Sequence, residues 1–315
     1  MEYRQLGRSG LRVSEISLGS WLTLGSSVDP DATRDLVHRA FDLGINLFDT
    51  ADVYANGAAE EALGRALREL PRHHVVIASK CFFPMSSSPN DRGLSRKHVT
   101  ESVEGSLRRL GTDYLDIEQC HRPDPHTPVE ETVRAFEDLI RQGKVLYWGV
   151  SEWRAEHLVD ACRIAELRHA YAPISNQPQY SILRRGIERA VLPASERQGV
   201  GQIVFSPLAQ GALTGKYSGG VRPGGSRAAD QQRNQFMDAF LEDEMLARVD
   251  RLQPLADELG LSMAQLALAW CLRRPSVAST IVGVTRPEQL DDNVKASGRR
   301  LPDEVLDAID DLFPA

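Results

Sequence analysis

The sequence predicts an α/β fold in which eight parallel strands close into a (β/α)8 barrel of the TIM type. Short β-rich runs alternate with longer segments of helical periodicity, and this alternation predicts parallel strands joined by helical crossovers. An open doubly wound sheet is the competing architecture, but the number of strands favours the barrel. The predicted strands are residues 16–20, 45–50, 75–80, 115–121, 145–151, 173–177, 202–206 and 279–283.

A second observation supports the barrel: the predicted strands end in polar residues of chemically different types. In a parallel barrel these ends meet at one face, where the loops build a site. An ordinary surface would be rich in Lys and Glu, so we interpret the set as a functional site. Its members are Asp49, Lys80, His121, Ser151, Gln177 and Ser206.

The other elements follow from turn signals and periodicity. Residues 2–6 and 12–16 flank Gly-Arg-Ser-Gly and predict an N-terminal β-hairpin. Apolar residues at helical spacing predict helices in 31–44, 59–70, 95–111, 128–144 and 154–167, with extra helices toward the C-terminus. The Leu/Ala stripe 264–272, Trp148 and Trp270 are predicted core. No change in composition marks a boundary, so residues 1–315 are predicted to form one domain.

Composition excludes several classes of protein. Of 315 residues, 42% are hydrophobic and 26% charged, which is typical of a globular chain and not of a disordered one. A net charge of -7 argues against a nucleic-acid surface. No apolar run approaches about 18 residues, so no membrane contact is expected. Four scattered cysteines and the absence of a signal segment predict a reduced, cytoplasmic protein.

Familiar cofactor and metal motifs are missing from the sequence. It contains no G-x-G-x-x-G, no G-x-x-x-x-G-K and no H-E-x-x-H. Rossmann-type nucleotide binding, P-loop phosphate transfer and zincin chemistry therefore lose their usual markers. The histidines are scattered, and the pair His73–His74 lies in a helix-to-strand loop, so no metal site is predicted.

Four residues at the predicted barrel mouth could together provide a tyrosine general acid. Tyrosine has a pKa near about 10, too high for fast proton donation at neutral pH. A nearby ammonium is expected to lower that pKa, a carboxylate keeps the ammonium charged, and a neutral imidazole orients a carbonyl oxygen. Asp49, Tyr54, Lys80 and His121, here called the tetrad, supply these groups. Each alone has a structural explanation, and their convergence favours carbonyl reduction.

The sequence resembles the aldo-keto reductases over nearly its whole length, and the segments around the tetrad carry the resemblance. Residues 44–67 are similar to the segment with the family's catalytic Asp and Tyr, 77–80 to that with its Lys, and 119–125 to that with its His. The resemblance implies that the tetrad is catalytic. It also implies an NADPH-dependent reductase of aldehydes or ketones that binds NADP(H) in an extended groove.

The resemblance further implies a set of cofactor-binding residues. Ser151 and Gln177 match positions that hold the nicotinamide carboxamide, and Phe205 matches an aromatic residue that stacks on the ring. Loop 206–216 matches the pyrophosphate side, and 285–293 the adenosine end. The full set is Ser20, Trp21, Asp49, Ser151, Glu152, Gln177, Phe205, Ser206, Pro207, Leu208, Gln210, Lys216, Arg227, Gly283, Thr285, Arg286, Gln289, Asp292 and Asn293.

Within the family, the sequence is most similar to the branch that includes the β-subunits of voltage-gated potassium channels. Three positions depart from that pattern. His121 stands where the channel subunits have Asn, which favours a working reductase. Glu152 replaces Asn or Arg beside the cofactor, where an acid would repel a pyrophosphate, and Phe205 replaces Tyr or Trp.

The sequence leaves two other functions open. One is a regulatory subunit that holds NADP(H) as a redox reporter, and the other is a Schiff-base lyase that uses Lys80. Loops 22–30, 82–94 and 218–235 are expected to set substrate specificity, and the last is either a surface loop or a lid. The expected partner is a small carbonyl substrate, and the sequence allows a homo-oligomer.

Overall fold

The strands close into a barrel of parallel strands, as predicted. This computed structural model describes residues 1–230, 234 and 237–314. The barrel strands are β3 (Ile16–Gly19), β4 (Leu47–Asp49), β5 (Val76–Cys81), β6 (Leu115–Cys120), β7 (Val145–Ser151), β8 (Ser175–Gln177), β9 (Gly201–Val204) and β10 (Val277–Val282). They follow one another around the barrel in sequence order, and β10 pairs with β3 to close it.

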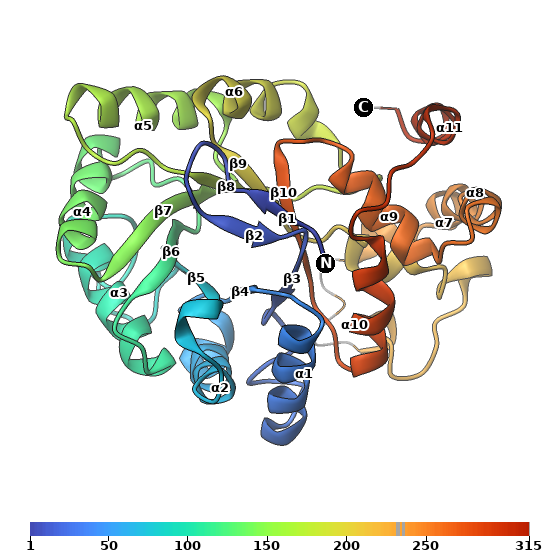
Figure 1. The fold of residues 1–315 in the computed structure, drawn as a ribbon, viewed down its shortest axis with the longest axis horizontal. Coiled ribbons are helices and arrows are strands. Elements are labelled where there is room, and N and C mark those ends of the chain that lie inside the picture. The colour runs from blue at the N-terminus through green and yellow to red at the C-terminus, as the bar shows by residue number, and fades with distance from the viewer. Residues whose placement is uncertain (231–233, 235–236, 315) are drawn as a thin grey trace.

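Helices surround the barrel (Figure 1). The connections along the first two thirds of the chain carry α1 (Pro30–Asp42), α2 (Ala58–Leu67), α3 (Arg96–Leu110), α4 (Val129–Arg141), α5 (Ala155–Leu167) and α6 (Val191–Gln198). The remaining side is covered by α7 (Asp243–Asp250), α8 (Gln253–Glu258), α9 (Met263–Leu272), α10 (Pro287–Asn293) and α11 (Asp303–Leu312), the predicted C-terminal helices.

Local sequence explains where these helices begin and end. The Ser95 hydroxyl accepts the backbone N–H of His98 and caps α3, and Gly111 ends that helix in the left-handed conformation. Every residue of α9 is buried, so the Leu/Ala stripe is core, as predicted. Trp148 and Trp270 are likewise fully buried.

The N-terminal hairpin closes one end of the barrel. Strands β1 (Tyr3–Gln5) and β2 (Arg12–Ser14) pair antiparallel, and Figure 1 shows them across the near end of the barrel. Leu6 and Val13 of this hairpin join the apolar cluster inside the barrel. Gly7 packs so closely that a Cβ there would lie 2.4 Å from the Gly199 carbonyl oxygen, ahead of β9. The hairpin therefore covers the amino-terminal ends of the strands and leaves the carboxyl-terminal ends for a site.

Three of the polar residues predicted to end strands lie one or two residues from the observed strand ends. Strand β5 runs one residue past Lys80, while His121 follows the last residue of β6 and Ser206 lies two residues beyond β9. Cys81 and Cys120 belong to the apolar core that includes the surrounding helices, on the side of the strands opposite the site. Alternation along a strand accounts for this arrangement.

The predicted loop 218–235 is only partly described. It contains 3-10 turns at Ser218–Gly220 and Arg227–Ala229. Residues 231–233 and 235 lie outside the described residues, so its action as a lid stays a prediction. In the described part of the chain, no single helix is long and apolar enough to cross a membrane. The bent pair Asp243–Glu258 and Met263–Leu272, at 88°, meets those criteria only jointly.

Candidate active site

Lys80 lies at the centre of the predicted site. Its side chain is fully buried near the end of β5. The ammonium group donates hydrogen bonds to Oδ2 of Asp49 at 2.7 Å, to the Thr50 carbonyl oxygen at 2.7 Å and to the Tyr54 hydroxyl at 3.2 Å. Asp49 ends β4, and Tyr54 begins the 3-10 turn Tyr54–Gly57. The fold thus joins these tetrad residues in one hydrogen-bonded group.

Burial and hydrogen bonding set the charge state of this group. Burial alone would lower the pKa of Lys80, but Asp49 and Tyr54 favour the ammonium, and its pKa lies above the ordinary value. Burial raises the pKa of Tyr54, and Lys80 offsets that effect only in part. The expected lowering of the Tyr54 pKa is therefore wrong, because desolvation of the phenolate outweighs the attraction of Lys80. Tyr54 keeps its proton at neutral pH.

His121 completes the predicted tetrad from the loop after β6. Its imidazole is 6% exposed. The ring lies edge-on to Tyr54, with centroids 5.6 Å apart. Burial holds the pKa of His121 well below its usual value, and the positive charges of Lys80 and Arg122 lower it further. The ring is therefore neutral at pH 7. Among the described residues, its Nδ1 atom has no hydrogen-bond partner.

Predicted cofactor residues on β7 and β8 are linked to the tetrad directly. The Gln177 amide donates to Oδ1 of Asp49 at 2.7 Å, so both Asp49 oxygens accept hydrogen bonds. The Ser151 hydroxyl donates to the Gln177 carbonyl oxygen at 2.8 Å. Ser20 joins from the other side, since its backbone N–H donates to the Asp49 carbonyl oxygen at 2.9 Å. These residues therefore share one polar surface at the carboxyl ends of the strands.

Phe205 and Glu152 flank the loop that follows Gln177. The Phe205 backbone pairs with that loop, donating its N–H to the Pro178 carbonyl oxygen at 3.1 Å. The exposed Glu152 accepts the backbone N–H of Gln179 at 2.6 Å. The Glu152 carboxylate is thus held toward a backbone amide of this loop, and the repulsion of a pyrophosphate that the sequence predicts stays a prediction.

A second group of predicted cofactor residues gathers around the loop after β9, which also holds Pro207 and Leu208. The Gln210 amide donates to the Ser206 hydroxyl at 2.7 Å, and the Arg227 guanidinium donates to the Gln210 side-chain oxygen. Arg227 also lies over the Trp21 ring, 5.7 Å from its centroid. A Cβ at Gly283 would lie 3.9 Å from the Trp21 carbonyl oxygen. Loops far apart in sequence therefore meet here.

Residues 285–293 comprise the two residues before α10 and the helix itself. The Gln289 side chain accepts the backbone N–H groups of Thr285 at 2.8 Å and Arg286 at 3.3 Å. Asp292 instead accepts hydrogen bonds from Ser262 and Gln265, and Asn293 is buried. Arg286 and, in the loop after β9, Lys216 present exposed cations. Asp292 thus helps to hold α10 against the start of α9.

Left-handed backbone conformations concentrate at the predicted site. Ala55, directly after Tyr54, has φ 48°, while Glu152, Ser206 and Gln210 have φ 57°, 53° and 60°. Such conformations cost free energy in residues with a Cβ and recur at functional sites. This backbone geometry is independent support for a binding site at this face.

Two residues close to the tetrad were missed from sequence. Phe83 lies edge-on to His121 with ring centroids 4.9 Å apart, and the Arg122 guanidinium lies 5.6 Å from the Phe83 centroid. Phe83 comes from loop 82–94, which was expected to set specificity. Arg122 directly follows His121, and this adjacency in the sequence could have indicated that Arg122 lies near the tetrad.

A buried acidic cluster behind the Tyr54 turn was also missed. Asp52 accepts the Ser102 hydroxyl at 2.7 Å and the Val53 backbone N–H at 2.6 Å, and burial raises its pKa to about 7. Glu118 is fully buried, and burial and the nearby Asp52 raise its pKa well above the ordinary value. Among the described residues, neither carboxyl group forms a hydrogen bond or an ion pair with a tetrad side chain.

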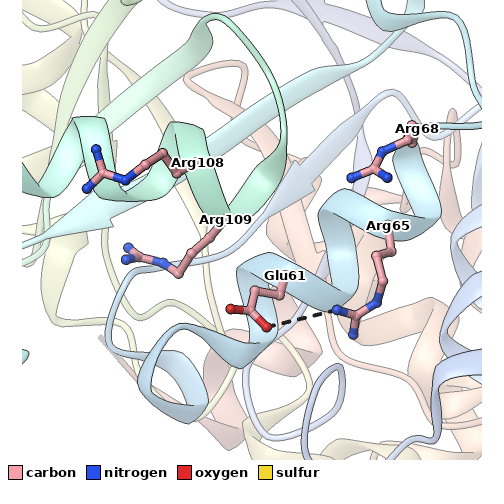
Figure 2. A pocket seen from close by; sticks show the side chains of 5 residues that line it. All are labelled: Glu61, Arg65, Arg68, Arg108 and Arg109. Carbon is pink, nitrogen blue, oxygen red and sulfur yellow. Dashed lines mark ion pairs between the residues drawn. The ribbon is translucent and has the colours of Figure 1, made fainter.

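A separate cavity of about 450 Å³ lies between α2 and α3 and is lined by Glu61, Arg65, Arg68, Arg108 and Arg109 (Figure 2). Arg65 pairs with Glu61, and Arg109 pairs with the buried Glu60 at 2.6 Å. Arg65, Arg108 and Arg109 stand in the last turns of their helices, where cations complement the helix dipole. No predicted site residue lines this cavity.

The described residues contain no cluster of His, Cys, Asp and Glu suited to a metal ion.

The fold and site together define a class of protein: a parallel (β/α)8 barrel whose carboxyl-terminal face carries a buried Lys–Asp–Tyr group beside a neutral His. Comparison with known proteins gives the family. The sequence matches the Aldo/keto reductase family over residues 15–313, and the chain belongs to that family of oxidoreductases.

Relatives cover nearly the whole chain. A protein of Oryza sativa subsp. japonica is 45% identical over 98% of this chain and 96% of its own length. An Arabidopsis thaliana protein is 45% identical over 94% of this chain and 91% of its own length. Both are named probable voltage-gated potassium channel subunit beta. The predicted likeness to that branch is therefore confirmed.

Proposed function

We propose that the chain is an NADP(H)-dependent oxidoreductase that reduces aldehydes or ketones to alcohols, with Tyr54 as the general acid. The observation that carries the proposal is the hydrogen bond from the buried Lys80 ammonium to the Tyr54 hydroxyl, supported by the Asp49 carboxylate. A permanent positive charge beside a protonated phenol stabilises the phenolate that proton donation leaves behind.

The donors of the site suit a nicotinamide dinucleotide phosphate. Near the tetrad the polar groups are uncharged. The Gln177 amide has a second N–H beyond the one that it donates to Asp49, and the Ser151 hydroxyl, which donates to the Gln177 carbonyl oxygen, can still accept a hydrogen bond from a carboxamide. Farther out, Lys216, Arg227 and Arg286 supply cations for phosphate groups. When bound, such a cofactor supplies a hydride to the carbonyl carbon.

The chain's own residues handle the carbonyl oxygen. Tyr54 and the neutral His121 can both donate hydrogen bonds to it, and their donation strengthens as negative charge develops. The Tyr54 proton then passes to this oxygen. Lys80 stays charged and stabilises the phenolate, while Asp49 holds the ammonium in place. Gln177 keeps the Asp49 carboxylate oriented toward Lys80.

The proposal is tested by replacing the hydroxyl alone. Tyr54→Phe should lower aldehyde-dependent NADPH oxidation by about a hundredfold to ten-thousandfold, the range of a lost general acid. NADPH affinity, followed by the fluorescence of the bound cofactor, should stay within about twofold, because the predicted contacts lie elsewhere. A variant that keeps more than half of the wild-type turnover would show that Tyr54 is not the acid.

A second candidate function is a regulatory subunit that binds NADP(H) and reports its redox state. The names of the relatives favour it. The presence of His121 as a neutral donor beside Tyr54 favours the reductase. Tight NADPH binding without oxidation by any reactive aldehyde would support the regulatory function.

A further inference from the structure

Arg122, the residue after His121, carries a positive charge that has no role in the proposed mechanism. Arg122 is only partly exposed, and its guanidinium donates one hydrogen bond, to the His121 carbonyl oxygen at 2.5 Å. A guanidinium carries five N–H donors, so most of its capacity is left over. Within the described residues, no carboxylate lies within ion-pair distance of Arg122. A partly buried cation without an anion is costly, and this cost favours an anionic ligand.

The acid nearest to Arg122 along the chain is committed elsewhere. The Asp124 carboxylate accepts the backbone N–H groups of Leu94 at 2.8 Å and His126 at 2.9 Å, and the Thr127 hydroxyl at 2.8 Å. It thereby ties two loops together. Asp124 therefore does not neutralise the charge of Arg122, because its carboxylate accepts hydrogen bonds from these other groups.

Arg122 also lies close to where a carbonyl oxygen would bind. Its positive charge is near enough to lower the pKa values of both Tyr54 and His121. Its guanidinium stands 5.6 Å from the Phe83 centroid, and Phe83 stands edge-on to the His121 ring. The Phe83 ring thus lies between the proposed binding point of the carbonyl oxygen and a cation that has no anionic partner among the described residues.

We propose that Arg122 and Phe83 form a subsite for an anionic substituent, so that this site prefers carbonyl substrates with a carboxylate on a flat apolar body. The inference rests on the proposed function and specifies its substrate class. Phe83 provides the face for the apolar body. The planar Arg122 fork can take the carboxylate in a bidentate pair, which fixes the distance between the charged group and the reacting carbonyl.

The test compares charged and neutral forms of one substrate. The probes are meta- and para-carboxybenzaldehyde and their methyl esters, reduced by the NADPH-bound protein. Hydrogen bonds to charged groups are worth about tenfold to hundredfold. The wild type should therefore favour at least one acid over its ester by about tenfold in kcat/KM. Arg122→Gln should bring that ratio close to unity, with less than about threefold loss for the ester, and Arg122→Lys should retain part of the preference.

A matched control is Arg68→Gln, the same change at an exposed arginine between α2 and α3, which should leave the ratio unchanged. The inference is overturned if the wild type shows no preference for either acid over its ester, or if the Arg122→Gln protein keeps that preference. In both cases the reductase proposal stands. If no aldehyde is reduced, the reductase proposal fails, and calorimetry with para-carboxybenzyl alcohol decides about Arg122. Binding weakened about tenfold by Arg122→Gln supports the subsite, and equal binding overturns it.

Discussion

At the scale of single residues, one buried ammonium organises the candidate site. Lys80 binds Asp49 and Tyr54 at once, and Gln177 occupies the second Asp49 oxygen. Because Asp49 is bonded on both sides, the ammonium has one favoured position. In the proposed reaction, the raised pKa of Tyr54 keeps the proton on the phenol until a stronger base forms on the substrate.

The buried Asp52 gives a prediction about stability and pH. Its pKa rises from 3.8 to about 7 on folding, mainly through burial. Between these values the folded state binds a proton that the unfolded state lacks, so the free energy of unfolding falls as pH rises through this window. The loss amounts to at most about 4 kcal/mol. Asp52→Asn removes this group and should make stability less dependent on pH between about pH 4 and pH 7.

Urea unfolding at several pH values measures this effect. The matched control is Asp113→Asn, an exposed aspartate that should leave the slope unchanged. Wild-type and Asp52→Asn curves that run parallel across the window would show that Asp52 titrates as an ordinary carboxyl group.

At the scale of elements, the packing of the hairpin and the candidate site lie at opposite ends of the barrel. The hairpin β1–β2 fills the amino-terminal end of the barrel with Leu6 and Val13, and the site residues stand at the opposite end. Helix α10 positions a predicted cofactor residue at its start. Its first turn begins with Arg286 and Pro287, and Gln289 folds back onto the amides that precede it. This leaves the Arg286 cation exposed at the predicted adenosine end of the groove.

Arg286 is therefore predicted to read the 2′-phosphate of NADPH. Arg286→Ala should weaken NADPH binding by about tenfold and NADH binding far less, because only NADPH carries the phosphate that a guanidinium can bind. Titration with both cofactors measures the difference, and Arg300→Ala, an exposed arginine farther along the chain, is the control. Equal losses for both cofactors would mean that another group recognises the phosphate.

At the scale of the whole molecule, the alternation of β-rich and helical segments predicted the barrel, and a turn signal predicted its hairpin. The eight β-rich runs, the stop at Gly111 and the buried stripe of α9 are local features, so they could be recognised in the sequence. The convergence of Asp49, Tyr54 and Lys80 also followed, because parallel strands bring their carboxyl ends to one face.

Other features of the site could not be predicted, because they depend on packing in three dimensions. The pKa of Tyr54 depends on how deeply the phenol is buried. The link from Gln177 to Asp49 joins residues 128 positions apart. The place of Arg122 beside Phe83 depends on two loops meeting, and the burial of the Asp52 carboxyl group depends on the packing around it.

The most direct test of the proposed activity follows the hydride itself. NADPH labelled with deuterium at the transferable position is mixed with an excess of para-carboxybenzaldehyde, and the alcohol is analysed by mass spectrometry. We expect alcohol that carries one deuterium on its reacting carbon with the wild type, and almost none with Tyr54→Phe. Unlabelled alcohol would contradict direct hydride transfer from the cofactor, and the absence of alcohol despite bound NADPH would contradict the proposal that this chain is a carbonyl reductase.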